Sequence, residues 1–346
     1  MSYMKDESGK VEVPMSVPLR IASLLPSATE ICFALGLGDW LVGVSHECDF
    51  PPQARGKPVL TAPKIDAHVS SVEIDRQVNS LVSQGLSLYQ IDEQLLRELR
   101  PDLILTQDVC HVCAVPFSEV REATRRLLGA EADILSLSPR TLKDVFEDIG
   151  RVGSATGSEF AAQRLVTRLQ ERLESLRVET SELRHPRVLV LEWLGPPMVA
   201  SHWTPELIRI AGGHPILGRD GEPSRPTEWQ RILDEAPEVV LVAPCGFQVK
   251  QSLREMGELI ERPGFSQTPA VQQGQLAVVD GSSYFNRSGP RLVDSAEIAA
   301  LVIHPEHFGG RMEFGREALV SWSQLEIDDA NGFMGTEKKG EPCFQR

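Results

Sequence analysis

The sequence predicts an α/β protein in which one long helix bridges two doubly wound lobes. Short apolar segments of strand length alternate with segments of helical periodicity on both sides of the middle of the chain. This alternation is typical of mostly parallel sheets with helices on both faces. Between the two series, residues 158–183 have apolar side chains at helical spacing among many charges. The length of 346 residues leaves room for two domains.

The N-terminal lobe is expected over residues 18–140, behind a flexible arm at residues 1–17. Ser27 or Thr29 is expected to cap its first helix, because Ser and Thr oxygens accept hydrogen bonds from the first helical turn. Strands are expected at residues 19–25, 41–45, 103–106 and 133–137. Helices are expected at residues 27–35, 70–81, 92–99 and 117–128.

A connecting helical segment at residues 141–185 precedes a C-terminal lobe at 186–308, and residues 309–346 are expected to form a tail. The two lobes share a local pattern of a helix end, a proline, an acidic residue and an apolar strand, at Leu99–Leu105 and at Glu235–Leu241. In the second lobe, strands are expected at residues 188–192, 239–243 and 276–280. Helices are expected there at residues 205–211, 229–235, 253–260 and 291–302.

The charge and the N-terminus limit the partners and the compartment. With 35 basic and 49 acidic residues the net charge is −14, which argues against binding to nucleic acid or to anionic lipid. No segment approaches the ~18–20 apolar residues of a membrane span, so no membrane insertion is expected. Asp6 and Glu7 interrupt the ~7–15 apolar residues that a signal peptide needs. We therefore expect a cytoplasmic protein, or a periplasmic one if a leader was removed.

Four of the six cysteines lie just past the carboxyl ends of predicted strands: Cys48, Cys110, Cys113 and Cys245. Ligands of open α/β sheets bind beyond these strand ends, so the four thiols are expected at the ligand site. Thiolates in this number suit a tetrahedral zinc ion or an iron–sulfur cluster, and the four cysteines form one predicted metal site. Three histidines near the same strand ends are able to support it: His46, His111 and His202.

Two other interpretations of these cysteines stay open. Free cysteines are often small buried residues without a chemical role. Alternatively, the Cys-x-x-Cys pair of Cys110 and Cys113 has the spacing of a redox dithiol, in which one thiol attacks and the second resolves. A disulfide scaffold is not expected, because six cysteines are few for this length and the cytoplasm keeps thiols reduced.

Several segments resemble the class III periplasmic substrate-binding proteins, which carry vitamin B12, haem, siderophores and some metals to ABC importers. They lie at residues 20–38, 41–52, 99–105, 236–242 and 283–291, with a Gly-Gly pair at Gly212-Gly213, and the likeness extends over about residues 18–308. The cobalamin-binding members are the most similar, because they have counterparts of Val42–Pro52 and Tyr284–Arg291. The resemblance implies two lobes bridged by a rigid helix, with cobalamin or a related corrinoid held in the cleft between lobes.

Aromatic and cationic residues follow two of the predicted strands, Cys48 follows a third, and all of them are expected to contact such a ligand. Aromatic side chains with a few polar groups suit a flat macrocycle, and arginine pairs with its carboxylate or amide groups. For Trp193 and Phe285, packing in the core is the competing interpretation. The predicted ligand-binding residues are Cys48, Trp193, His202, Trp203, Tyr284, Phe285 and Arg287.

The chain departs from the resemblance at two points. An export signal is not seen, and Gln94 and Gln230 stand where importer-docking members of this kind place a glutamate, so docking to an ABC importer is doubtful. Phosphate-loop and nucleophile-elbow motifs do not occur. The leading hypothesis is a small-molecule-binding protein that is not an enzyme. The alternatives are a metal or iron–sulfur protein and a Cys-x-x-Cys redox enzyme.

Overall fold

The computed structural model describes residues 19–84, 88–107, 121–122, 124–126, 132–311, 314–315 and 317–321. The chain divides into two compact units. Unit 1 contains Met1–Ala67 and Arg76–Gln170, and unit 2 contains His68–Asp75 and Glu171–Arg346. None of the helices in these described ranges is long and apolar enough to span a bilayer.

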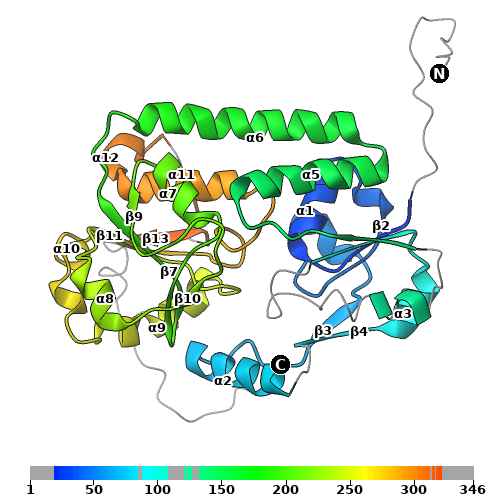
Figure 1. The fold of residues 1–346 in the computed structure, drawn as a ribbon, viewed down its shortest axis with the longest axis horizontal. Coiled ribbons are helices and arrows are strands. Elements are labelled where there is room, and N and C mark those ends of the chain that lie inside the picture. Colours follow the sequence, from blue (N-terminus) through cyan, green and yellow to red (C-terminus); the bar gives the residue numbers. More distant parts are fainter. Residues whose placement is uncertain are drawn as a thin grey trace, which may run out of the picture. The chain divides into compact units, whose positions relative to one another are not determined.

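Figure 1 shows the chain coloured along its sequence, and its unit 1 contains a parallel four-stranded sheet in the order β2-β1-β5-β6. The strands are β1 (Ile21–Ser23), β2 (Leu41–Val44), β5 (Leu103–Thr106) and β6 (Asp133–Ser136). The residues of β1 and β5 are all buried, as expected for strands covered on both faces. The helices of this unit include α1 (Pro26–Ala34), α3 (Glu93–Leu99) and α5 (Leu142–Thr156). The four predicted strands and their parallel pairing are confirmed. The helix predicted at residues 117–128 lies largely outside the described residues.

The start of α1 corrects the predicted helix cap. The N-cap residue is Leu25, which provides no side-chain hydrogen bond, and Pro26 occupies the first helical turn, where its missing N–H costs nothing. Ser27 and Thr29 lie inside the helix and are buried. The Thr29 hydroxyl contacts Ser23 Oγ at 2.8 Å instead. The prediction of a Ser27 or Thr29 cap was therefore wrong, because proline starts the helix earlier than the polar residues do.

A small antiparallel sheet of β3 (Thr61–Pro63) and β4 (Tyr89–Ile91) completes unit 1 and was not predicted. Along the chain, α2 (Ser71–Ser83) lies between these two strands, and its first turn belongs to unit 2. There the backbone N–H of Ser71 donates to Glu255 Oε1 at 2.6 Å, so a buried carboxylate from another helix caps α2.

Unit 2 is built on a mixed sheet in the order β10-β8-β7-β11-β12-β13, with β9 paired to β7. Its centre is the parallel set β7 (Arg187–Leu194), β11 (Val239–Val242) and β12 (Leu276–Val279). These three strands match the prediction. The strands β8 (Pro197–Val199) and β10 (Arg225–Pro226) extend one side antiparallel, while β9 (His214–Pro215) is parallel to β7.

Unit 2 contains helices at the four predicted segments, the end of the predicted connecting helix, and two short helices at residues 269–272 and 305–308 that were not predicted. They are the second half of α6 (Glu159–Thr180), α7 (Thr204–Ile210), α8 (Trp229–Asp234), α9 (Val249–Ile260), α10 (Pro269–Gln272), α11 (Leu292–Ile303) and α12 (Pro305–Phe308). A cluster of buried apolar residues from β7, β11, β12, α8 and α9 forms the core of this unit.

Within the expected tail at residues 309–346, the structure describes one strand. The strand β13 (Leu319–Ser321) pairs antiparallel with β12, with Val320 opposite Val278, and Val320 is 2% exposed. β13 satisfies the backbone groups along the edge of β12, which would otherwise lack partners. A three-residue strand is too short to show a clear periodicity, so the sequence did not reveal it.

The local pattern shared by the two lobes has a common structure. Arg100 and Ala236 both adopt left-handed φ angles, 41° and 42°, immediately before the proline. The following acidic side chain then accepts a hydrogen bond from the backbone N–H of an arginine at the start of a neighbouring strand. Asp102 accepts from Arg20, immediately before β1, and Glu238 accepts from Arg187, the first residue of β7, each at 2.8 Å. The repeated sequence pattern therefore marks the same strand entry in both units.

The predicted long helix is confirmed as α6, whose 22 residues pass from unit 1 into unit 2. At its N-terminal end, Gly153 of α5 allows close packing, because an added Cβ would lie 2.5 Å from Ala162 Cβ. In unit 2, Arg172 of α6 forms ion pairs with Asp294 (2.7 Å) and Glu297 (2.8 Å) of α11. These charge-assisted contacts are half-buried and fix α6 to the last long helix.

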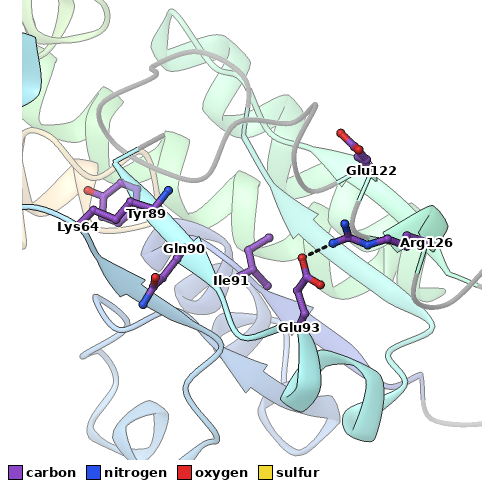
Figure 2. A pocket seen from close by; sticks show the side chains of 7 residues that line it. All are labelled: Lys64, Tyr89, Gln90, Ile91, Glu93, Glu122 and Arg126. Atoms are coloured by element: carbon purple, nitrogen blue, oxygen red, sulfur yellow. Dashed lines mark hydrogen bonds and ion pairs between the residues drawn. The ribbon is translucent and has the colours of Figure 1, made fainter. Parts of the chain in front are cut away.

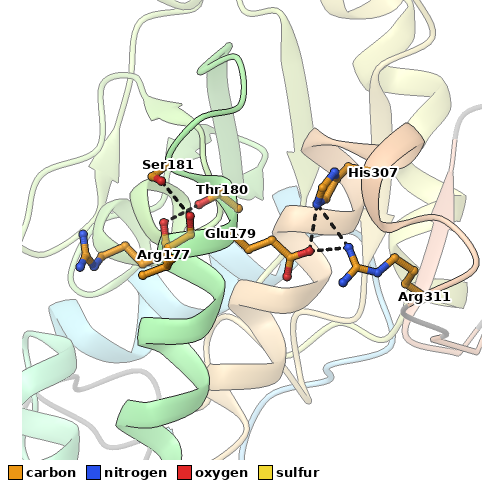
Figure 3. A network of polar contacts seen from close by, with 7 residues as sticks. Arg177, Glu179, Thr180, Ser181, His307 and Arg311 are labelled. Carbon is orange, nitrogen blue, oxygen red and sulfur yellow. Dashed lines mark hydrogen bonds and ion pairs between the residues drawn. The ribbon is translucent and has the colours of Figure 1, made fainter.

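A second polar network holds the end of α6 (Figure 3). Glu179 contacts His307 of α12 at 2.9 Å and also pairs with Arg311. The hydrogen bond from His307, together with that from Arg311, lowers the pKa of Glu179 despite partial desolvation. The carboxylate therefore stays ionised at neutral pH and ties α12 to α6.

The buried side chain of Asp148 in α5 predicts a pH-dependent stability. Its Oδ1 accepts from Arg151 at 2.7 Å, whereas its buried Oδ2 has no hydrogen-bond partner in the described part of the chain. Burial raises the pKa of this carboxyl to about 6, above its value in an unfolded chain. The folded state therefore binds the proton of Asp148 more tightly than the unfolded state does. The contribution of this carboxyl to the free energy of unfolding is highest at low pH, where the carboxyl is protonated, and it falls as the pH rises through 6.

We expect Asp148→Asn to raise the free energy of unfolding by about 1–2 kcal/mol at pH 8 and to have no such effect at pH 4. Urea titrations followed by circular dichroism at the two pH values measure this difference. Glu147→Gln is the matched control, because its ion pair with Lys143 is exposed to solvent and contributes little to stability. An equal effect of Asp148→Asn at both pH values would contradict the assignment.

Candidate functional site

In unit 2, the residues that follow β12 form a tightly hydrogen-bonded loop at the carboxyl end of the parallel strands. Asp280 accepts from the backbone N–H of Ser283 at 2.7 Å and from its hydroxyl at 3.1 Å. Asn286 donates to the carbonyls of Ala243 (2.8 Å) and Gly281 (3.1 Å), which ties the loop to the end of β11. We call residues 280–291 the β12 loop. Its position agrees with the rule that α/β proteins bind ligands beyond strand ends.

Trp203 and Phe285 join the β12 loop to the start of α7. The indole Nε1–H of Trp203 donates to the Phe285 carbonyl at 2.6 Å, and the Phe285 N–H donates to Ser295 Oγ at 3.0 Å. Phe285 is 1% exposed and has a φ of 33°, an unfavourable angle for a residue with a side chain. Phe285 is thus a core residue that shapes the loop, while Trp203 is half-buried beside it.

We expect Trp203→Phe to lower the free energy of unfolding by about 1–3 kcal/mol, because the Phe285 carbonyl loses its donor. Thermal unfolding followed by circular dichroism measures this change. Trp229→Phe is a comparison with an exposed donor, Nε1 to Pro263 at 2.9 Å, and a smaller effect is expected. Equal losses in both variants would contradict a special role of Trp203 in holding the loop.

Tyr284 and Arg287 are the other predicted residues in the β12 loop. Tyr284 is half-buried, with the Arg291 guanidinium 5.4 Å from its ring centroid and the Phe314 ring in edge contact at 6.5 Å. Burial raises the pKa of Tyr284, so its phenol stays neutral. Arg287 is only 6% exposed and lies 3.5 Å from Ser282 Oγ. Burial also raises the pKa of Asp280, against the opposing effect of Arg287.

Trp193 packs in the core of unit 2, and His202 lies beside Trp203. Trp193 is 7% exposed, donates to the Gly195 carbonyl at 3.1 Å and packs on Phe247 at 5.2 Å. It is a packed residue of β7. His202 has a φ of 54°, and its ring lies 5.5 Å from that of Trp203. The structure thus brings together Trp203, Tyr284, Phe285 and Arg287, with His202 at their side.

In unit 1, Cys48 lies after β2 in a cluster of hydroxyl groups. Thr29 Oγ1 donates to Cys48 Sγ at 3.1 Å, and Ser45 Oγ lies 3.3 Å from the same sulfur. The thiol is 5% exposed. Burial, together with the nearby Cys48, raises the pKa of Cys32 to about 12, so Cys32 is an unreactive thiol.

The four-cysteine metal site stays a prediction. Cys110 and Cys113 lie outside the described residues, while Cys48 belongs to unit 1 and Cys245, half-buried after β11, belongs to unit 2. Within the ranges that the structure describes, no three His, Cys, Asp or Glu side chains are grouped so as to hold a metal ion.

Sequence reasoning missed most of a polar cluster at the end of β2. His46 donates its backbone N–H to Thr61 Oγ1 at 3.1 Å, and its Nδ1 lies 2.7 Å from the same oxygen. Its ring packs on Tyr89 at 5.3 Å, and the Tyr89 hydroxyl donates to Glu47 at 3.3 Å. Thr61 and Tyr89 come from the unpredicted β3–β4 sheet, so only the folded chain places them near His46.

Unit 1 also contains a polar cavity of about 290 Å³ beside β4 (Figure 2). Figure 2 shows Lys64 and Tyr89 at one end and the ion pair of Glu93 with Arg126 at the other. None of the predicted site residues lines it. Its lining is mostly charged, whereas sites for organic ligands are mostly apolar, so it is not assigned as the ligand site.

Comparison with known proteins shows similarity over most of the chain. The model of a family described as periplasmic binding protein matches residues 21–282. An uncharacterized ABC transporter substrate-binding lipoprotein of Bacillus subtilis is 25% identical over 294 residues, which cover 84% of this chain and 82% of the relative. The vitamin B12-binding protein of Photorhabdus laumondii is 25% identical over 285 residues, which cover 82% and 86%.

Solved structures show the same fold. The periplasmic vitamin B12-binding protein of Vibrio cholerae has a TM-score of 0.60 at 23% identity, with 83% of this chain and 98% of that chain covered. A periplasmic haem-binding protein of Roseiflexus has a TM-score of 0.61 at 20% identity, with 84% and 100% covered. The predicted α/β fold and the predicted family resemblance are confirmed.

Two predictions find no support in these relatives. Their names describe a lipoprotein and periplasmic proteins, so the cytoplasmic location expected from the N-terminus is unsupported. The relative from Bacillus subtilis is named as part of an ABC transporter, which counters the expected doubt about importer docking. No relative described here is named as a zinc or iron–sulfur protein or as an enzyme.

Proposed function

This chain belongs to the periplasmic binding protein family, and from that premise we propose that it binds a cobalt corrinoid or a related tetrapyrrole without chemical conversion. The observation that carries the proposal is the sequence similarity to vitamin B12-binding proteins over more than four-fifths of the chain. We further propose that it acts outside the cytoplasm and presents its ligand to an ABC importer, as the name of the Bacillus relative suggests.

The chemistry around the β12 loop suits such a ligand. Trp203 and Tyr284 present half-buried aromatic rings, and a flat macrocycle gains much of its binding energy from contact with apolar surfaces. The buried guanidinium of Arg287 supplies several N–H donors for the amide or carboxylate groups at the edge of a tetrapyrrole. The proposed ligand residues in unit 2 are therefore Trp203, Tyr284, Arg287 and, beside them, His202.

Titration calorimetry with cyanocobalamin, cobinamide and haemin tests the proposal and distinguishes the ligands. We expect a Kd in the micromolar range or tighter for the corrinoids. Tight binding of haemin alone would narrow the ligand to haem. Absence of binding to all three compounds by the folded protein would refute the proposal.

Docking to an importer needs a separate test, because this chain lacks the two glutamates that the family resemblance leads us to expect on its docking surface. Gln94 and Gln230, which replace the expected glutamates, each donate to an acidic side chain four residues later: Glu98 at 3.0 Å and Asp234 at 2.8 Å. Stimulation of the ATPase of a reconstituted corrinoid importer by the ligand-loaded protein would support docking. A lack of stimulation by protein that binds ligand would refute this part alone.

A further inference from the structure

His46 lies at the carboxyl end of β2, where its Nδ1 is held by a hydrogen bond and its Nε2 is left to bind a ligand. The residue follows β2 by two positions, where the parallel sheet of unit 1 is expected to meet ligands. Thr61 Oγ1 holds both its backbone N–H and its Nδ1, and Tyr89 packs against its ring. In the described part of unit 1, no hydrogen bond is made by Nε2. The ring is thus fixed in orientation while one nitrogen is available.

The Thr61 hydroxyl lets Nε2 act as an electron-pair donor. A hydroxyl either donates or accepts, so Thr61 can accept a hydrogen bond from Nδ1–H, and this tautomer of the ring has its lone pair on Nε2. A histidine that ligates a metal usually donates its other N–H to a polar group in this manner.

The neighbouring side chains at this strand end are less suited to ligation. Cys48 Sγ is buried and contacts the hydroxyls of Thr29 and Ser45. The Tyr89 hydroxyl already donates to Glu47, and Tyr89 is 7% exposed. His46 is half-buried, and among these side chains it alone offers an imidazole nitrogen as a metal ligand.

We propose that His46 Nε2 is an axial ligand to the metal of the bound tetrapyrrole, specifically the cobalt of a corrinoid. This proposal rests on the proposed function. In the step, the bond between cobalt and an axial water breaks, the bond between cobalt and Nε2 forms, the water leaves, and no electron is transferred. Thr61 is a positioning residue, because its hydroxyl contacts His46 and would act on the metal only through that histidine.

Electron paramagnetic resonance of cob(II)inamide bound to the full chain tests the ligation. Cobinamide has no nucleotide base, so a protein histidine is the expected source of nitrogen coupling to the unpaired cobalt electron. We expect a triplet superhyperfine splitting in the wild type and a doublet in protein labelled with nitrogen-15 histidine. The splitting should vanish in His46→Ala and in His46→Gln, and persist in His214→Ala, a change at an exposed histidine of unit 2.

Affinities provide a second readout that does not depend on the spectrum. His46→Ala should weaken binding of aquocobinamide by about tenfold or more, and Thr61→Val by a smaller factor. Neither change should alter the Kd for dicyanocobinamide, because cyanide occupies both axial positions. Circular dichroism of each variant verifies its fold.

The outcomes separate this inference from the proposed function. If the wild type binds none of the corrinoids, the proposed function fails. If it binds cobinamide but shows no nitrogen splitting, or if the splitting survives in both His46 variants, axial ligation by His46 is wrong while the proposed function stands. Equal losses of affinity for the aquo and dicyano forms would likewise overturn the ligation, because they indicate a contact with the macrocycle instead.

Discussion

Gly281→Ala is expected to lower the free energy of unfolding by about 3 kcal/mol or more. A Cβ at this position would collide with the Pro244 carbonyl oxygen and would lie 2.8 Å from the carbonyl carbon and oxygen of Ala243. All of these atoms are backbone at the end of β11, so no flexible side chain can move aside. The strand ends can accommodate the methyl group only by separating.

Urea unfolding followed by circular dichroism measures this effect. Gly257→Ala in α9 is the matched control, because an added Cβ there meets no atom within 4 Å. Alanine is a better helix former than glycine, so the control is expected to gain about 0.5–1 kcal/mol. A Gly281→Ala protein as stable as the wild type would show that the loop shifts freely, and the rigid placement of Tyr284 and Arg287 would then be wrong.

Arg287→Met is expected to weaken the affinity for cyanocobalamin by about 10–100-fold, a loss of roughly 1.4–2.8 kcal/mol in binding free energy. The guanidinium is almost fully buried, so its hydrogen bonds to a ligand would form with little competition from water. Arg287→Lys keeps the charge but loses the planar set of donors, and an intermediate loss is expected.

Titration calorimetry at pH 7 measures the Kd values of these variants. Arg254→Met on the exposed face of α9 is the control, and its Kd should stay within a factor of about two of the wild type. Thermal unfolding of Arg287→Met identifies any loss of fold. An unchanged Kd in a folded Arg287→Met protein would remove Arg287 from the proposed ligand site.

The ligand-site residues stay a prediction, but the structure shows how four of them lie in unit 2. Trp203, Tyr284, Phe285 and Arg287 were predicted from their positions after strands, and the structure joins them through one loop and the start of α7. The sequence did not distinguish Phe285, which is buried and shapes the backbone, from Trp203, which is half-exposed. Both residues are aromatic and follow a strand, and only packing assigns their different surroundings.

The surroundings of His46, in contrast, could not be predicted from the sequence. Thr61 and Tyr89 lie 15 and 43 residues from His46 along the chain, and no periodicity connects them. They meet because β3 and β4 pair antiparallel, which places Thr61 opposite Ile91 and Tyr89 opposite Pro63. Pairing between short strands depends on backbone hydrogen bonds available to any residue type, so the sequence contains little signal for it.

What the sequence determined by itself was the set of local and repeated features. These are the apolar strands of the two parallel sheets, the long helix α6, the matching strand entries at Pro101 and Pro237, and the family resemblance. Each depends on residues close together in the chain, where spacing and side-chain type directly reflect burial. Tertiary structure alone decided the pairing of β13, the Glu255 cap of α2, the packing of Trp193 and the partners of His46. These contacts join residues distant in the chain, and they depend on which backbone and side-chain groups remain unsatisfied once the local elements have formed.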